Sequence, residues 1–364
     1  MPVAPSIVNI KVNGAPIDRA LLLTMQTLEV ELGVHAQGVF RFRTVMGQDP
    51  QGDWAGFAER SFTPGSVVSV DVRMGTNQRS LIRGYITEFK MDFNADPCTS
   101  TLEIVGMDAL EKLKRREGRR NMANKTLQAA VTEIFNDSGI QPPGSGVPNT
   151  GAASPNGQPP MQAQNDLEFI RRLADENNCE VYVEPSNGTD QGFFKPLSLS
   201  DAPEIPTAIV IQQGTVNHVR NASFYYDLSG ATAVIGNFVD ANGRALGDPV
   251  RVDLRDTLSS FDKTLLGPPD FAKVERLQRS GSETRDHLQS RCAAKLEKTS
   301  WVVVGKGELD TQTYGDLLFP RHRVKVQGAA RSFGGDYLVW KVTHKLTREQ
   351  HCQSFELRRK LGVN

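Results

Sequence analysis

A pattern of three short strands near the C-terminal end constrains the fold most strongly. Within residues 318–357, Val324 and Val326 alternate with polar residues, as in a half-buried strand. Gly334-Gly335 predicts a tight turn into a second strand, in which β-branched and aromatic residues dominate. A polar turn then leads to a last strand over 354–357. The stretch therefore predicts a three-stranded antiparallel meander.

The same order of signals occurs nearer the N-terminus. Each copy contains a proline, two alternating valines, a tyrosine and a Cys-x-Ser sequence: Pro64, Val68, Val70, Tyr85 and Cys98 in the first, and Pro320, Val324, Val326, Tyr337 and Cys352 in the second. Short strand patterns recur by chance, so two unrelated hairpins are the alternative interpretation. The shared order favours a duplicated β-unit.

Composition excludes several classes of protein. The chain has 42 basic and 42 acidic residues, so no overall field draws it to nucleic acid or to an anionic membrane. No apolar run approaches the ~18 residues of a membrane span. The start of the chain lacks the basic region and apolar core of a signal peptide. Its four cysteines are scattered singly, which predicts reduced thiols in a protein made and folded in a cytoplasm.

We expect a mainly β fold with an α+β insert, comprising two small antiparallel β-barrels of similar topology and helical connecting domains. The predicted domains are an N-terminal barrel over 1–115, an α+β insert over 116–204, a discontinuous second barrel over 205–240 plus 299–358, and a charged inserted segment with a helix over 241–298.

Two helices and a loop are predicted within the insert. Leu127, Ala130, Val131, Ile134 and Phe135 form one apolar stripe, and Gly139 stands where that helix should stop. Asn165, with Glu168 three residues later, begins a second helix as a capping box. Between them, residues 141–164 are rich in Pro, Gly, Ser and Asn, which predicts a mobile loop.

A basic run, LEKLKRREGRR, links the first barrel to this insert. One interpretation is a patch that grips an anionic partner. We favour a solvated link, because charge runs are commonly exposed faces.

The segment NDLEFIRRLADENNCEVYV, residues 165–183, resembles the D-x-E-F-hydrophobic-R-R-L-A-x-E pattern of phage late control D proteins. That baseplate hub family also forms the N-terminal part of type VI secretion spike proteins. The flanking strand regions agree with it, so the likeness spans nearly the whole chain. Spike fusions of this kind continue into an OB-fold and a needle. This chain ends at Asn364 without room for either, which implies a separate spike chain.

No local pattern of catalytic, cofactor-binding or metal-ligating residues stands out. The sequence lacks GxSxG, HExxH and a P-loop, and the Gly-Ser-Gly at 144–146 has no Lys-Ser/Thr partner. His287 and Cys292 are not spaced as an i,i+4 pair, and His351-Cys352 would point to opposite faces of a strand. The remaining histidines named here stand alone and are interpreted as surface or packing residues: His35, His218, His322 and His344. We therefore expect no enzyme and no cofactor.

The resemblance implies the trimeric structural hub of a contractile tail or injection machine. Such a hub joins a sixfold inner tube to a threefold spike in a virion baseplate or a related particle. Its partners would be itself, the spike, and the tube or a tube initiator. Two similar barrels, repeated three times, would present six quasi-equivalent edges. The alternatives are a tail-associated peptidoglycan hydrolase or protease, and a carbohydrate-binding β-protein.

Overall fold

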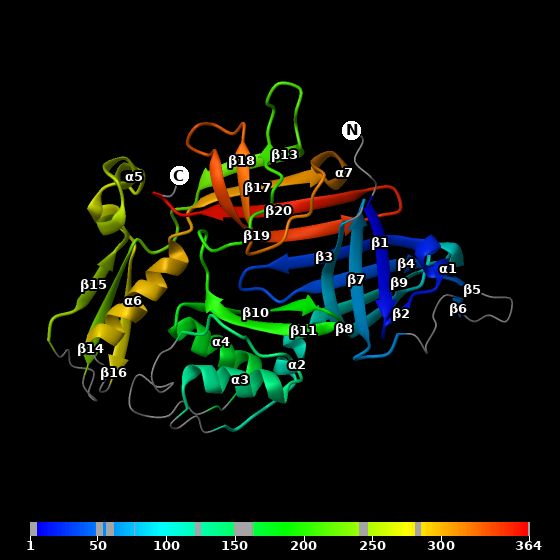
Figure 1. The fold of residues 1–364 in the computed structure, drawn as a ribbon, viewed down its shortest axis with the longest axis horizontal. Helices are drawn as coiled ribbons and strands as arrows, with labels where there is room; N and C mark the ends of the chain where they lie inside the picture. Colours follow the sequence, from blue (N-terminus) through cyan, green and yellow to red (C-terminus); the bar gives the residue numbers. More distant parts are fainter. Residues whose placement is uncertain are drawn as a thin grey trace.

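The computed structural model describes residues 6–48, 54–55, 62–75, 77–120, 125–148, 162, 164–239, 247–280 and 285–362. Figure 1 shows a large twisted β-sheet, a group of helices with a hairpin below it, and a smaller sheet crossed by one long helix at its side. Strands dominate, so the prediction of a mainly β protein with an α+β insert is confirmed. None of the helices within these ranges is long and apolar enough to cross a bilayer.

The large sheet contains 13 strands of the described chain. Their order is β13-β17-β20-β19-β3-β4-β9-β8-β7-β1-β2, with β18 beside β19 and β12 beside β18. The strands are β1 (Ser6–Val12), β2 (Ala15–Pro16), β3 (Met25–Gly33), β4 (Val39–Val45), β7 (Val67–Met74), β8 (Asn77–Asp92), β9 (Thr101–Asp108), β12 (Ile209–Val210), β13 (Val219–Tyr226), β17 (Val303–Asp310), β18 (Arg323–Gln327), β19 (Gly335–Leu346) and β20 (His351–Arg359). A short helix, α1 (Arg19–Thr24), and a small hairpin of β5 (Gly47–Gln48) and β6 (Trp54–Ala55) flank the first strands.

The expectation of two separate barrels is corrected by this strand order. Among the described residues no pairing closes either group of strands, and the path is open at β13 and at β2. The two groups merge instead, because residues 28–33 of β3 pair antiparallel with residues 341–346 of β19. This pairing joins strands at opposite ends of the sequence, which a local pattern of alternation does not reveal.

The duplicated strand order is confirmed. Strands β7, β8 and β9 form one antiparallel meander, and β18, β19 and β20 form another. Two more strands extend each meander, namely β4 and β3 beside β9, and β17 and β13 beside β20. We call β3, β4, β7, β8 and β9 the first β-unit, and β13, β17, β18, β19 and β20 the second β-unit. Their spatial orders, β3-β4-β9-β8-β7 and β13-β17-β20-β19-β18, match strand by strand.

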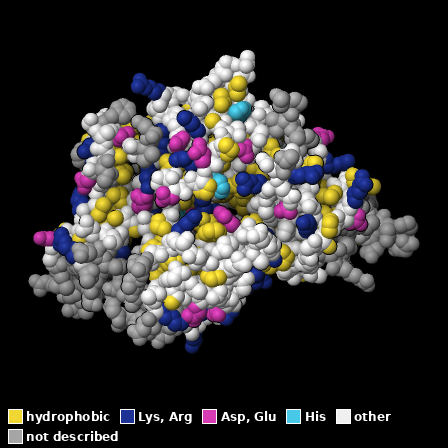
Figure 2. All heavy atoms as spheres, in the orientation of Figure 1, with side chains coloured by type: hydrophobic (Ala, Val, Ile, Leu, Met, Phe, Trp, Pro, Cys, Tyr) yellow, Lys and Arg dark blue, Asp and Glu magenta, His cyan; other side chains and the backbone are white. Residues whose placement is uncertain are grey.

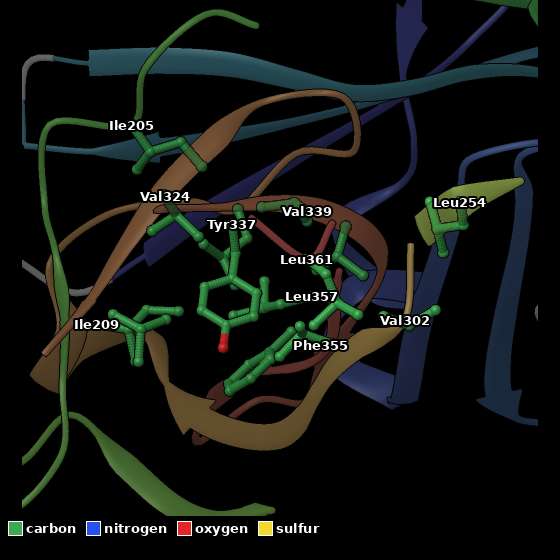
Figure 3. Close-up of a cluster of buried hydrophobic side chains, with 14 of the residues drawn as sticks. Ile205, Ile209, Leu254, Val302, Val324, Tyr337, Val339, Phe355, Leu357 and Leu361 are labelled. Atoms are coloured by element: carbon green, nitrogen blue, oxygen red, sulfur yellow. The ribbon is translucent and has the colours of Figure 1, made fainter. Parts of the chain in front are cut away.

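Each β-unit has its own hydrophobic core. In the first, alternation along β4 buries Phe40 and Phe42 and leaves Arg41 and Arg43 exposed. Gly106 on β9 makes room for the ring of Phe40, since a Cβ there would lie 2.3 Å from it. In the second unit, Figure 3 shows the ring of Tyr337 among apolar side chains that include Val324 and Phe355.

The insert packs helices against a hairpin. It contains α2 (Leu110–Lys114), α3 (Leu127–Asp137), α4 (Asp166–Glu176), β10 (Cys179–Ser186) and β11 (Thr189–Pro196). The predicted stripe of α3 is buried, Gly139 takes a positive φ of 62°, and the Asn165 side chain accepts from the Glu168 amide at 2.9 Å. Sequence analysis missed β11, although Asn187-Gly188 is a standard hairpin turn.

The predicted mobile loop over 141–164 has a structured beginning. The Gln141 amide donates to the Asp190 carbonyl at 2.9 Å, and Val147 packs against the core of the insert. Residues 149–161 and 163 lie outside the described residues. Residues 141–148 form a loop, as predicted, which these contacts attach to the insert, and its mobility stays a prediction.

Residues 233–239, which the predicted domains placed in the second barrel, belong to a separate three-stranded sheet. There β14 (Ala233–Val239) pairs with β15 (Val250–Asp253) and, in parallel, with β16 (Val274–Ser280). Three short helices, η2 (Leu254–Thr257), α5 (Ser260–Leu265) and η3 (Pro269–Phe271), lie between β15 and β16. Figure 1 shows α6 (Arg285–Thr299) lying across this sheet. It is the helix predicted within 241–298, and it buries Leu288, Cys292 and Leu296.

Candidate assembly interface

The pairing registers align the two β-units residue by residue. Where β8 pairs with β9, a β-bulge lies at Thr87, and where β19 pairs with β20, one lies at Trp340. A second bulge lies in each unit, at Gln26 in β3 and at Arg220 in β13. When the pairing is followed from strand to strand, starting at the first bulge of each unit, these two positions are equivalent. A bulge sets the local bend and twist of a strand. Two matched bulges therefore indicate one architecture used twice.

The turns that precede β7 and β18 also match. Gly65 and Arg321 occupy equivalent positions and both have positive φ, 83° and 65°. The Gly65 amide donates to the Ile86 carbonyl at 2.8 Å, and the Arg321 amide donates to the Val339 carbonyl at 3.0 Å. This backbone geometry costs a glycine nothing but strains an arginine. The second β-unit thus has a strained arginine at this position, and its side chain forms hydrogen bonds with Glu180 and Gly33.

Some of the sequence marks that suggested the duplication are not equivalent in space. The registers place Tyr337 opposite Val324, and its counterpart opposite Val68 is Gly84, not Tyr85. Tyr337 is fully buried, whereas Tyr85 is half-buried and faces the insert. Likewise, Cys98 lies in an exposed turn before β9, while Cys352 is buried within β20. The strand order was predicted correctly, but two of its markers match only in sequence.

The contact between the units is formed by β3 and β19. Glu31 forms an ion pair with Lys341 at 2.8 Å, and Glu29 forms one with Lys345 at 3.3 Å. All four side chains are substantially exposed, so these pairs set register more than they add stability. Leu32 packs against the cores of both units. One unit is therefore joined to the other by a strand edge and by apolar residues that include Leu32 and, from β19, Leu346, which lies in the core of the first unit.

Two strand edges that correspond to this contact pair with no strand within the described ranges. The outer edge of β13 pairs with nothing, and the second half of β8, beyond Ile86, has no strand on the side where β7 pairs with its first half. Tyr225 on β13 is 41% exposed, and Phe93, just after β8, is 59% exposed. Open edges with exposed aromatic residues invite pairing with another chain.

A buried arginine ties both β-units to the insert. The guanidinium of Arg321 donates to Glu180 at 2.5 and 3.0 Å and to the Gly33 carbonyl at 2.9 Å. It also lies 3.8 Å from the centre of the Tyr182 ring. Burial lowers its pKa, but attraction to Glu180 outweighs burial, so the pKa is raised overall. The charge of Glu180 is further stabilised by the His35 amide at 2.7 Å.

The basic run between the first β-unit and the insert is solvated in its middle, as expected, where Lys114, Arg115, Arg116, Glu117 and Arg119 are exposed, but it is packed at both ends. Its helix α2 buries Leu110 and Leu113, and Arg120 donates to the fully buried carboxylate of Asp166 at 2.6 Å. Arg120 also pairs with Asp137 at 2.7 Å. The interpretation as a free patch for an anionic partner is weakened, because Arg115, Arg116 and Arg120 form ion pairs with acidic residues of the same chain. Figure 2 shows cationic and anionic side chains intermingled over the face it displays.

A cavity between the first β-unit, the insert and the 319–322 turn is the best candidate for a catalytic site among the described residues, because acidic side chains and a histidine line it. It has a volume of about 250 Å³, and Asp108, Asp190 and His322 are among its lining residues. Burial raises the pKa of Asp108 to about 7. However, its two oxygens accept the backbone amides of Gly38 and Leu110 at 2.6 and 3.0 Å. This carboxyl group has a structural role that explains its burial.

His344, which was interpreted as a solitary histidine, forms a buried pair with His351. His344 Nδ1 lies 3.1 Å from His351 Nε2, His344 Nε2 lies 3.1 Å from the Leu318 carbonyl, and His351 Nδ1 lies 3.1 Å from the Ser6 hydroxyl. With both rings neutral, Ser6 donates to His351, which donates to His344, which donates to Leu318. Burial lowers the pKa of His344 to about 3 and that of His351 to about 4. Their pairing across the β19–β20 hairpin escaped sequence analysis, because the two residues are seven positions apart.

The other histidines of this set stay apart from one another. His35 lies in the turn after β3, His218 precedes β13, and His322 precedes β18. Within the described ranges no group of three or more His, Cys, Asp or Glu side chains is placed to hold a metal ion.

No family model matches the sequence, and the search of curated proteins found no match. Solved structures with the same fold were found over nearly the whole chain. The 43 kDa tail protein of prophage MuSo2 from Shewanella oneidensis has a TM-score of 0.65 at 14% identity, covering 97% of this chain and 98% of its own. A tail protein from Neisseria meningitidis MC58 has a TM-score of 0.68 at 12% identity, covering 98% and 97%.

A third similar structure is the E. coli c3393 protein, described as a component of the type VI secretion system that is structurally similar to the T4 tail proteins gp27 and gp5. Its TM-score is 0.59 at 16% identity, covering 96% of this chain and 76% of its own. At these identities the likeness establishes the fold. The chain is similar in structure to phage tail and type VI secretion proteins.

Proposed function

We propose that this chain is the hub subunit of a contractile tail or related injection machine. In this proposal three copies form a closed ring between the inner tube and a central spike supplied by a separate chain. The observation that carries the proposal is the presence of two β-units of matching order and register in one polypeptide. The shared fold with tail and secretion proteins supports the same assignment.

Two matched units per chain solve a problem of symmetry. A ring of the inner tube has sixfold symmetry, and a spike has threefold symmetry. Three chains with two β-units each present six similar surfaces to the tube, while every other part of the chain is repeated only three times. The insert and the β14–β16 sheet with α6 occur once per chain, so they are the parts available for threefold contacts.

The contact between units within one chain supports head-to-tail closure. Strand β3 of the first unit meets β19 of the second, so different surfaces are used on the two partners. A heterologous contact of this kind forms a closed ring when its rotation divides a full turn. Closure would also cover the open edges, which are otherwise a liability for aggregation.

The role proposed is symmetry matching and transmission of force, without turnover. Segment 165–183, which resembles late control D proteins, forms α4 and the start of β10 and supplies the buried side of the insert. The assembled particle would be a virion baseplate or an injection-machine baseplate. Zymography of purified protein on peptidoglycan tests the hydrolase alternative, for which we expect no clearing.

The test of the proposal is the mass of the purified full-length protein as a function of concentration, alone and with its spike partner. Light scattering or mass photometry should detect a species of three chains. A species of two or four chains, or a monomer even when the spike is bound, would contradict the hub assignment.

A further inference from the structure

We infer that residues 359–362 form a strap that holds the three-stranded sheet and α6 against the second β-unit, and that this part of the chain opens as one body when the strap is lost. We call residues 233–299, as far as the structure describes them, the side domain. The strap acts within one chain, so it is independent of the ring proposed above.

The side domain is connected to the second β-unit by two chain segments that lie side by side. It begins after β13 and ends before β17, and its three strands pair only with one another in the described part of the chain. The Asp227 amide donates to the Val302 carbonyl at 2.7 Å, and the Thr299 hydroxyl donates to the Ala231 carbonyl at 2.8 Å. A domain connected at one place can turn about that connection unless other contacts hold it.

The strap begins at an arginine that is fixed in the second β-unit. Arg359 is 5% exposed and lies opposite Val303 in the pairing of β20 with β17. Its guanidinium donates to the carbonyls of Ser332 and Gly334 at 2.9 and 2.7 Å, and it lies 5.0 Å from the centre of the Tyr337 ring. The chain therefore leaves β20 from a rigid point.

The residues that follow Arg359 lie on the side domain. The Lys360 ammonium forms an ion pair with Glu297 of α6 and lies 4.8 Å from the centre of the Trp301 ring. A Cβ at Gly362 would lie 3.4 Å from Leu258, just before α5. The strap thus contacts both α6 and the segment that leads into α5.

Leu361 makes the contact that should contribute most. It is 8% exposed and belongs to a buried cluster that includes Leu254 and Leu258 of the side domain and Val339 and Leu357 of the second β-unit. Figure 3 shows Leu361 between Val339 and Leu254. The ion pair of the preceding residue is partly exposed on both sides, and such pairs contribute little. Burial of the leucine side chain is therefore the larger contribution.

Another contact links the side domain to the insert. Lys298, near the end of α6, forms an ion pair with Asp175, near the end of α4. Asp175 is 65% exposed, so this pair is expected to be weak. Its loss alone should leave the side domain in place, which makes Lys298→Ala a control for the loss of a surface charge.

Amide hydrogen exchange of the full-length chain, followed by mass spectrometry, tests the strap. Leu361→Ala removes the apolar contact, and a shortened chain that ends at Arg359 removes the strap beyond its anchor. Arg358→Ala is the matched control beside the strap, because Arg358 donates to Glu356 at 2.7 Å and lies over the Trp340 ring, both outside the side domain.

We expect amide exchange in β14, β15, β16 and α6 to become about tenfold faster or more in Leu361→Ala and in the shortened chain. Exchange in β18, β19 and the first β-unit should keep its rate, and both control variants should exchange as the unchanged protein does. Unchanged exchange in the side domain overturns the inference. Equal acceleration in the side domain and the second β-unit also overturns it, because the two would then open together. If the shortened chain does not fold, Leu361→Ala decides by the same outcomes.

Discussion

Arg321 is predicted to be the residue whose loss most weakens the association of the two β-units with the insert. Its side chain is 13% exposed and that of its partner, Glu180, is 2% exposed. Arg321→Ala would remove both guanidinium hydrogen bonds to the buried Glu180 carboxylate and leave it the hydrogen bond from the His35 amide. Removing one partner of a buried ion pair typically costs about 3–5 kcal/mol. The free energy of unfolding should fall by about that amount.

The backbone at Arg321 makes the prediction more specific. Its φ is 65°, a left-handed conformation that costs a non-glycine residue roughly 1–2 kcal/mol. Arg321→Gly removes the same side chain as Arg321→Ala but relieves this strain. We therefore expect the glycine variant to be the more stable of the two by about 1 kcal/mol. A paired replacement, Arg321→Met with Glu180→Leu, should cost less than Arg321→Ala alone, since no buried charge is left unpaired.

Urea titration followed by fluorescence and circular dichroism measures these differences. Arg323→Ala is the matched control, because Arg323 pairs with Glu204 at 2.8 Å on the surface, where Glu204 is 64% exposed. A surface pair contributes about 0–1 kcal/mol. The reasoning is refuted if Arg321→Ala destabilises no more than Arg323→Ala, or if Arg321→Gly is less stable than Arg321→Ala.

Three further predictions concern the core, the insert and the histidine pair. Gly106→Ala should destabilise by about 1–3 kcal/mol, because its Cβ would lie 2.3 Å from Phe40, whereas Gly47→Ala has open space and should be neutral in thermal unfolding. Leu173→Asp should lower the free energy of unfolding by several kcal/mol, because it buries a charge in the insert. Arg172→Ala is its control in a urea titration. If Arg172→Ala were the more destabilising change, Leu173 would not be on the buried face of α4. His344 and His351 have lowered pKa values in the folded protein, about 3 and about 4. Their contribution to the free energy of unfolding is therefore full above pH ~6.5 and is lost as the pH falls toward these values. The free energy of unfolding should therefore rise more steeply with pH near pH 5 than that of the His344→Gln/His351→Gln variant, by roughly 2–3 kcal/mol per pH unit. This comparison cancels the opposing effect of Asp108, and equal slopes would contradict the neutral pair.

Local features of the fold were predictable from sequence. Alternation and turn residues located the meanders, and an apolar stripe with a capping residue located α3 and α4. These signals work because each depends on residues within one or two turns of the chain. The duplicated strand order followed from the same signals, although Tyr85 and Cys98 were matched to residues that are not their counterparts.

Non-local pairing was not predictable. The union of β3 with β19, the parallel pairing of β14 with β16 and the contact of His344 with His351 depend on which edges meet in space. Alternation says which face of a strand is buried and nothing about its neighbour. The candidate interface lies on such edges. Sequence analysis therefore predicted two similar units, whereas their residue-by-residue alignment required the pairing registers of the structure.

A density map of the assembled particle, averaged around its axis, tests the central claim most directly. Three chains should form one ring in which the first and second β-units alternate, related by rotations of about sixty degrees around the threefold axis. Strands β3, β4, β9, β8 and β7 should superpose on β13, β17, β20, β19 and β18 in that order. A ring whose two β-units lie at different heights along the axis, or an assembly with a number of chains other than three, would contradict the account.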